Sequence, residues 1–143
     1  MSHTELQLDR ILKSLSVFMD KIRSEMTHFK DLNLTTPQFH VLKYLLSKGP
    51  TKVKELAEKM DVKPSAITVM IDRLVQNNYV VRHHDSTDRR VIYISVTDDG
   101  KRVLQTIRKR HKATIQRYLV HLDKQELEAF ADTFEKLSEL PTQ

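Results

Sequence analysis

The amino-acid sequence predicts a mostly α-helical protein of the α+β class. Only two glycines and four prolines interrupt its 143 residues, and most of the chain shows apolar residues three and four apart, the spacing of one buried helix face. Two short runs, residues 79–82 and 91–96, are instead rich in β-branched and aromatic side chains, which indicates strands. A charged polar loop joins these runs. We therefore expect several helices and one β-hairpin.

The N-terminal segment, residues 4–30, has the pattern of one long helix. Its apolar positions form a nearly continuous stripe made of Leu8, Ile11, Leu12, Leu15, Phe18, Met19 and Ile22. This stripe is longer than the core of a small domain could cover, so we expect it to pack against a second subunit. A shorter helix is expected to begin at Thr36-Pro37 and to end at Gly49-Pro50.

Residues 51–76 contain two short helical patterns separated by a brief turn, which is the arrangement of a helix-turn-helix. Thr51 is a candidate N-cap of the first pattern. Pro64 suits the first position of the second, because the backbone donor that proline lacks would be unpaired there. Small hydroxyls and one arginine on the outer face fit a DNA major groove, although an ordinary amphipathic helix has a similar polar outside. The outer face of the second helix consists of Ser65, Thr68, Val69, Asp72 and Arg73.

The predicted hairpin follows this second helix directly. Its loop, residues 83–90 (HHDSTDRR), ends in two arginines. A basic hairpin beside a helix-turn-helix has one common use, as a wing that lies along DNA. After the hairpin, Thr97 is expected to cap a long helix, and Asp123 and Glu126 have the spacing of a capping box that opens a last helix. The predicted architecture is a winged helix-turn-helix with helices at both ends.

Three parts of the sequence resemble the MarR (multiple antibiotic resistance regulator) family of bacterial winged-helix repressors. The first is LTTPQFHVL at 34–42, and the second combines ELA at 55–57 with PSAIT at 64–68 and IDRL at 71–74. The third and most specific is DxxDRR at 85–90 followed by VTxxG at 96–100. The resemblance covers essentially the whole chain. In the DNA-binding part the departure from the family pattern is Val96, where leucine is more usual.

The resemblance implies which residues of the second helix contact DNA. Ser65 and Thr68 fit bases and phosphates equally well, and Arg73 is the best candidate for strong anchoring. The residues that would lie near base edges and flanking phosphates are Ser65, Ala66, Thr68, Val69 and Arg73.

For the wing, the family pattern implies that Arg90 enters the minor groove while Asp88 holds its guanidinium. An arginine is attracted by the negative potential of a narrow groove, and a carboxylate beside it fixes its rotamer. Arg89 would point to the other side, toward a backbone phosphate. An ordinary surface Asp–Arg pair is the alternative interpretation.

The same resemblance implies a domain organisation. One MarR-type domain, 1–143, would contain the winged helix-turn-helix at 35–100 and a helical dimerisation part made of 1–32 and 101–143. The N- and C-terminal helices would form a two-fold homodimer, and its two recognition helices would meet a pseudo-palindromic operator in successive major grooves.

Members of the family commonly bind a small ligand, often an aromatic or phenolic anion, between the dimerisation helices and the winged part. Here that cleft would involve Met19, Phe39, Tyr44 and Arg108. The same four residues equally fit plain core or surface positions.

Three histidines raise a second regulatory hypothesis. His28, His40 and His111 lie close to the positions from which zinc-responsive members of the family recruit ligands, and three imidazoles with one water can bind Zn²⁺. Phe39 and Ile107, however, stand where those members carry further ligands. We therefore assign no metal site and no cofactor, and keep these histidines as candidates.

The positive charge is concentrated in the predicted DNA-binding segment. The chain has a net charge of +5, and residues 51–110 hold 13 Lys or Arg against 8 Asp or Glu, while the remainder has 11 of each. Neutralisation of phosphates requires such a charge excess on one part of the surface.

Several other classes of function are excluded or disfavoured. The chain has no cysteine, which excludes thiol-based oxidant sensing, disulfides and thiolate zinc sites. No apolar run approaches the roughly 20 residues of a membrane span, so we expect a cytoplasmic protein. A Gly-rich phosphate loop, a Ser-His-Asp arrangement and paired carboxylates in an apolar surround are all missing, so we expect no enzyme.

The sequence therefore predicts a regulator that binds double-stranded DNA sequence-specifically, in the form of a homodimeric repressor released by a small ligand. One alternative is a zinc-responsive repressor of the same fold. The other is a sequence-independent architectural DNA-binding protein, which would show no preference between a palindromic site and random duplex.

Overall fold

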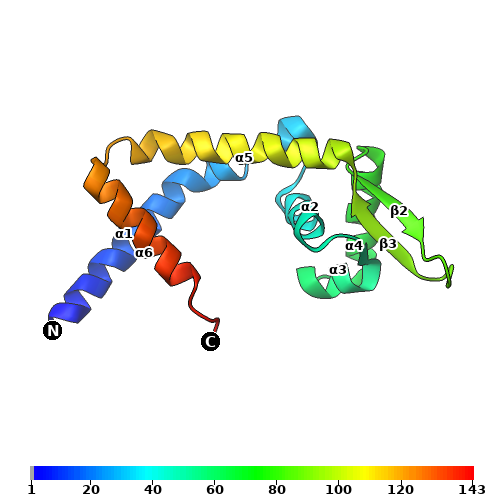
Figure 1. Cartoon of the computed structure of the whole chain (residues 1–143), viewed down its shortest axis with the longest axis horizontal. Helices are drawn as coiled ribbons and strands as arrows, with labels where there is room; N and C mark the ends of the chain where they lie inside the picture. Colours follow the sequence, from blue (N-terminus) through cyan, green and yellow to red (C-terminus); the bar gives the residue numbers. More distant parts are fainter. Residues whose placement is uncertain (1) are drawn as a thin grey trace. The chain divides into compact units, whose positions relative to one another are not determined.

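The computed structural model describes residues 2–143 and confirms the predicted fold class, because helices dominate and a small antiparallel sheet forms the hairpin (Figure 1). The chain divides into two compact units, residues 27–109 and residues 1–26 with 110–143. The elements in chain order are α1 (His3–Met26), the 3-10 helix η1 (Lys30–Leu32), α2 (Thr36–Lys48), β1 (Thr51–Lys52), α3 (Val53–Met60), α4 (Pro64–Gln76), β2 (Val80–His84), β3 (Ile92–Val96), α5 (Asp98–Leu119) and α6 (Lys124–Ser138).

The sheet has the strand order β1-β3-β2, and both pairings are antiparallel. The hairpin strands pair Val80 with Val96 and Arg82 with Ile94. Strand β1 was not expected from the sequence, and the prediction that Thr51 caps α3 is wrong. Thr51 pairs with Ile94 and is buried, its hydroxyl donates to the carbonyl of Gly49 at 2.8 Å, and Lys52 occupies the N-cap position of α3.

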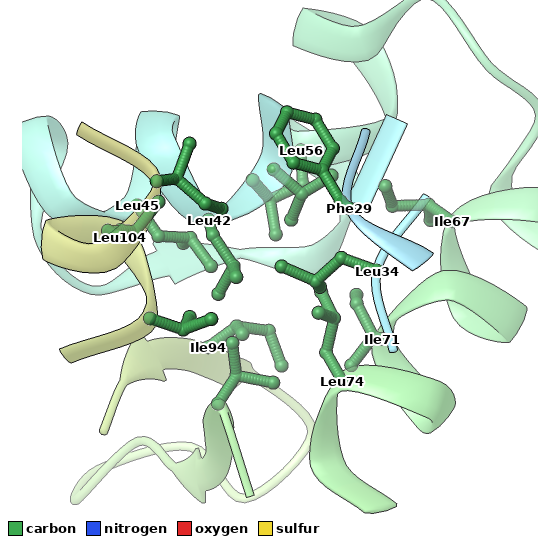
Figure 2. Close-up of a cluster of buried hydrophobic side chains, with 14 of the residues drawn as sticks. Phe29, Leu34, Leu42, Leu45, Leu56, Ile67, Ile71, Leu74, Ile94 and Leu104 are labelled. Atoms are coloured by element: carbon green, nitrogen blue, oxygen red, sulfur yellow. The ribbon is translucent and has the colours of Figure 1, made fainter. Parts of the chain in front are cut away.

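The hydrophobic core of the 27–109 unit lies between its helices and the sheet (Figure 2). Burying one large aliphatic side chain contributes about 1.5–3 kcal/mol, so each of these residues matters to the position of its element. Helix α4 is anchored in the core by its inner face, which leaves most of its opposite face exposed. The fully buried large side chains are Leu42, Leu45, Leu56, Ile67, Ile71, Leu74, Ile94 and Ile107.

The start of α5 is fixed tightly against the chain segment that follows α4. The hydroxyl of Thr97 accepts a hydrogen bond from the amide of Gly100 at 3.0 Å, as expected of an N-cap, and donates to the carbonyl of Asn78 at 2.5 Å. A Cβ on Gly100 would overlap the carbonyl oxygen of Tyr79 and lie 2.6 Å from a methyl of Val96. The glycine of the VTxxG motif therefore permits close packing of α5 on the hairpin.

The other unit, residues 1–26 with 110–143, is formed by α1, the end of α5 and α6. Phe18 and Tyr118 meet edge to face with their ring centres 5.4 Å apart. A ring nitrogen of His111 lies 2.7 Å from the carbonyl of Met26, at the end of α1. Neither α1 nor α6 contains a buried residue in the single chain. Among residues 2–143, no helix has the length and apolar character needed to span a bilayer.

Candidate DNA-binding surface

The outward face of α4 presents five predicted DNA-binding residues. Helix α4 begins at Pro64, and Ile67, Ile71 and Leu74 anchor its inner face in the core. Val69 is an apolar residue that remains 52% exposed, which suits contact with a thymine methyl group. The residues on the exposed side are Ser65, Ala66, Thr68, Val69 and Arg73.

Thr68 has a more specific geometry than the sequence indicates. Its hydroxyl donates to the carbonyl of Pro64 one turn earlier, at 2.9 Å. In this rotamer the oxygen of Thr68 retains only acceptor capacity, and phosphate oxygens are themselves acceptors. The hydroxyl of Thr68 is therefore suited to a base amino group, and its methyl group to an apolar base edge, rather than to a phosphate.

The loop of the wing, between β2 and β3, is organised by Asp85. Its carboxylate accepts hydrogen bonds from the hydroxyl of Thr87 at 2.6 Å and from the amide of Asp88 at 3.1 Å. The amide of Asp85 donates to the carbonyl of Val91 at 2.9 Å, which closes the loop. The Thr87 hydroxyl, followed by backbone amides, holds the pKa of Asp85 below its usual range. The wing loop is thus ordered by its own side chains.

Asp88 holds Arg90 through three hydrogen bonds. The Nε and Nη2 atoms of Arg90 donate to the two carboxylate oxygens of Asp88 at 3.2 and 3.3 Å, and the Arg90 amide donates to Oδ1 at 3.0 Å. The Arg90 side chain is 91% exposed, so its guanidinium points into solvent while its rotamer is fixed. Hydrogen bonding to Arg90 lowers the pKa of Asp88, which keeps the carboxylate charged. Arg90 is therefore an exposed cation that is bonded to a carboxylate of its own loop.

The remaining wing residues lie around this pair. Arg89 is exposed, and its carbonyl lies 2.8 Å from Nδ1 of His84. His83 stacks on Tyr93 with ring centres 5.8 Å apart and lies 2.8 Å from the hydroxyl of Ser95. His83 and His84 belong to strand β2, whereas the sequence placed both in the loop.

A groove of about 390 Å³ is bordered by α4, the wing, β1 and the start of α3. Its walls carry four cations, of which the sequence predicts only Arg90 as a DNA-binding residue. A strand pattern could have indicated that Arg82 points toward α4, because Val80 and Arg82 share a face of β2. Lys52 and Lys54 could not be predicted, because they reach the groove only through the unexpected strand β1 and the start of α3. The groove is lined by Lys52, Val53, Lys54, Thr68, Ile71, Arg82, Arg90, Val91 and Ile92.

Arg73 lines a second groove, of about 400 Å³, together with Lys30 and the start of α2. Lys30 belongs to η1 and was not selected from the sequence, since a single lysine outside the helix-turn-helix carries no signal. Two cations on the walls of an open groove beside α4 suit the phosphate backbone.

The charge of the 27–109 unit agrees with this surface. That unit contains 15 Lys or Arg and 9 Asp or Glu, whereas the other unit contains 9 and 10. The whole positive excess of the chain therefore lies in the unit that carries α4 and the wing.

The candidate ligand residues are placed as follows. Met19 is exposed on α1, and Arg108 is exposed on α5. The Phe39 ring lies 4.8 Å from that of Phe29, and Tyr44 lies beneath the ammonium of Lys59 at 5.7 Å. The ligand pocket stays a prediction.

The candidate metal residues are not gathered into a site. Within residues 2–143, no three His, Cys, Asp or Glu side chains are grouped as metal ligands. His28 and His40 are exposed, and His111 is engaged with the carbonyl of Met26.

Comparison with known proteins agrees with the geometry. The MarR family model matches residues 34–92. The HTH-type transcriptional repressor MdtR of Bacillus subtilis (strain 168) is 39% identical over 140 residues, which cover 97% of this chain and 90% of that protein. The crystal structure of the YusO protein from Bacillus subtilis has a TM-score of 0.82 at 39% identity, covering 99% of this chain and 100% of that one.

A third similarity concerns the fold alone. A mutant of S. aureus MepR bound to an oligodeoxyribonucleotide has a TM-score of 0.70 at 19% identity, covering 94% of this chain and 98% of that one. The family match and the extensive identity to a curated repressor lead to one conclusion: the chain belongs to the MarR family of DNA-binding, winged helix-turn-helix transcriptional regulators, which are not enzymes.

Proposed function

We propose that this chain is a homodimeric transcriptional repressor that binds a pseudo-palindromic operator and is released by a small ligand. The observation that carries the proposal is the arrangement of two reading elements on one basic unit. Helix α4 exposes small side chains suited to a major groove, and the wing presents Arg90 in a rotamer fixed by Asp88. Repression is proposed because MdtR, a close relative by sequence, is a repressor.

The proposed dimer is supported by the apolar surface of the 1–26 and 110–143 unit. Large apolar side chains of α1 and α6 are 38–64% exposed in the single chain, and a contiguous surface of this kind is rare on a monomer. We infer that the residues 1–32 and 101–143 supply the dimer interface and that 35–100 supplies the DNA-binding part. The exposed residues are Leu6, Leu8, Ile11, Leu12, Leu15, Val17 and Met19 on α1, and Leu127, Phe130, Phe134 and Leu137 on α6.

A two-fold dimer dictates the form of the operator. Two copies of α4 related by a two-fold axis would enter major grooves about one helical turn apart, roughly 34–36 Å from centre to centre. The site should therefore be a pseudo-palindrome, with Arg90 of each wing in the flanking minor groove. Arg73 and Lys30 would meet backbone phosphates beside each half-site.

The release of DNA by a ligand rests on the family and on the half-buried aromatic residues Phe39 and Tyr44. Ligand binding would act by favouring a dimer conformation whose two copies of α4 no longer match successive grooves.

The test is selection of bound sequences from a randomised duplex pool at about physiological salt, combined with light scattering of the free protein. The expected result is an enriched pseudo-palindrome and a dimeric mass. Enrichment of no motif would contradict sequence-specific regulation and favour an architectural protein that coats DNA. A monomeric mass at micromolar concentration would contradict the homodimer.

A further inference from the structure

An ion pair connects the recognition helix to the wing. Nη2 of Arg82, in β2, bonds to Oδ1 of Asp72, on α4. The two side chains are 37% and 52% exposed. Within residues 2–143, no other ion pair joins α4 to β2 or β3.

The sheet register explains how Arg82 reaches α4. Arg82 lies directly opposite Ile94, and residues directly opposite each other in an antiparallel pair share a face. Ile94 is fully buried in the core, as is Val80 two residues before Arg82. Arg82 therefore leaves the sheet on its helix-facing side, at the point where the core ends.

Arg82 also lines the groove of about 390 Å³ that α4 and the wing border, so the ion pair lies beside this groove. Thr68 on α4 and Arg90 in the wing both line the groove, so the two DNA-reading elements are separated there by open space. The Asp72–Arg82 pair bridges the same two elements beside it.

We propose that Asp72 and Arg82 are positioning residues that set the angle of the wing relative to α4, and that operator specificity depends on this pair although neither residue reads a base. The inference rests on the proposed function, because it requires α4 and Arg90 to engage one half-site together. A wing held at the correct angle raises the effective concentration of Arg90 at its groove once α4 has bound. A more mobile wing would lose part of that advantage.

The pair also keeps a cation from binding DNA indiscriminately. While Arg82 is bonded to Asp72 its charge is neutralised locally, whereas a released guanidinium beside the groove can contact any backbone phosphate. Specific and non-specific binding should then respond in opposite directions to the loss of Asp72. Asp72→Asn should weaken operator binding by up to about fivefold, the upper end of the range expected for loss of a partly exposed ion pair. It should strengthen binding to unrelated duplex and steepen the dependence of that binding on salt by up to about 1.8 units in log–log slope, about 0.9 for the Arg82 of each subunit.

The experiment compares four proteins by fluorescence anisotropy: the wild type, Asp72→Asn, Arg82→Gln and the exchange of both residues, Asp72→Arg with Arg82→Asp. Each is titrated with its selected operator and with a shuffled duplex of equal length at several salt concentrations. Both single variants should lower the ratio of specific to non-specific affinity, and the exchange should restore much of it. Glu55→Gln is the matched control, because it removes a similarly exposed ion pair with Lys48 that does not involve α4 or the wing.

A second measurement separates positioning from a general loss of stability. One base pair is inserted between the part of the half-site that α4 contacts and the part that the wing contacts. The wild type should lose more affinity for this spaced operator than Asp72→Asn does, because a mobile wing tolerates altered spacing. General destabilisation would weaken binding to both operators by the same factor.

Three results would overturn the inference: an unchanged specificity ratio in the single variants, no recovery in the exchange, or equal spacing tolerance. If Arg90→Ala still weakened operator binding in that case, the proposed function would stand and only the role of the pair would fall. Loss of the operator preference in the wild type itself would instead remove the proposed function.

Discussion

Removal of the Arg90 guanidinium is the most direct test of the wing as a DNA-reading element. The Arg90 side chain is 91% exposed and, among residues 2–143, bonds only to Asp88 of its own loop, so Arg90→Ala should leave the fold and the dimer intact. A guanidinium in a narrow minor groove makes contacts that alanine cannot replace. We expect operator affinity to fall at least tenfold.

The companion variant Asp88→Asn isolates the ordering of that guanidinium. Asparagine retains an oxygen that can accept from the Arg90 amide, but it loses the charge and the second oxygen that bonds to Nη2. Holding one long side chain in a single rotamer changes affinity by roughly 2- to 13-fold. Since one acceptor remains, we expect a loss in the lower half of that range, smaller than the loss from Arg90→Ala.

The assay is operator binding by fluorescence anisotropy across a salt series, with analytical ultracentrifugation of each variant. Arg90→Ala should also reduce the log–log salt slope by about 1.8 for the dimer, about 0.9 for each subunit, if the charge of each Arg90 replaces one counterion. Arg89→Ala is the matched control, since it removes the neighbouring charge without disturbing the Asp88 pair. Its loss should be smaller and equal for operator and unrelated duplex. Unchanged operator affinity in Arg90→Ala would refute the reasoning.

Three further predictions concern stability, pH and assembly. Gly100→Ala should destabilise the protein by about 1–3 kcal/mol in urea unfolding, because its Cβ would overlap the carbonyl of Tyr79, and unaltered stability would contradict the packing described for α5. The pKa of Asp85 is lowered chiefly by the Thr87 hydroxyl, and the pKa of Asp88 is lowered chiefly by Arg90, so both carboxylates stabilise the wing loop above about pH 3.8. That contribution should vanish as the pH falls through the lowered pKa values, and amide exchange should become faster in the wing alone. A loop that is equally protected in acid would contradict this prediction. Leu12→Glu places a charge in the proposed interface and should convert a dimer to a monomer by light scattering, whereas a persistent dimer would place the interface elsewhere.

The sequence predicted the helices, the hairpin and the family because each is encoded locally. Apolar spacing marks the buried face of α4, and the Asp123–Glu126 capping box forms as expected, with the Asp123 carboxylate accepting from the Glu126 amide at 2.9 Å. Strand β1 was missed because two residues are too short for a period of two to be recognised. Its partner Ile94 lies 43 residues away from Thr51 in the chain, and only the folded structure brings them together.

The candidate site was predicted only in part, because some of its residues are close together in the sequence and others are brought together only by folding. Arg90 and Asp88 were selected because their spacing lies within one loop. Lys30 and Lys52 were not, because each belongs to a different element and only the tertiary structure places it beside α4. The acceptor-only geometry of Thr68 likewise depends on a rotamer that no pattern of residue types specifies.

Three carboxylates lie on the surface that should face DNA, although every negative charge there opposes binding of a polyanion. Asp85 orders the backbone of the wing loop, Asp88 fixes one arginine and Asp72 engages another. A surface selected for non-specific affinity alone would replace them, since each substitution by a neutral residue would strengthen the electrostatic attraction to unrelated duplex. Their presence is explained if discrimination matters more than affinity. Each carboxylate lowers the electrostatic attraction to all DNA, while the order it imposes strengthens binding only at a site whose grooves match α4 and the wing together. The specificity of this regulator should therefore be more sensitive to loss of its aspartates than its total affinity for DNA is.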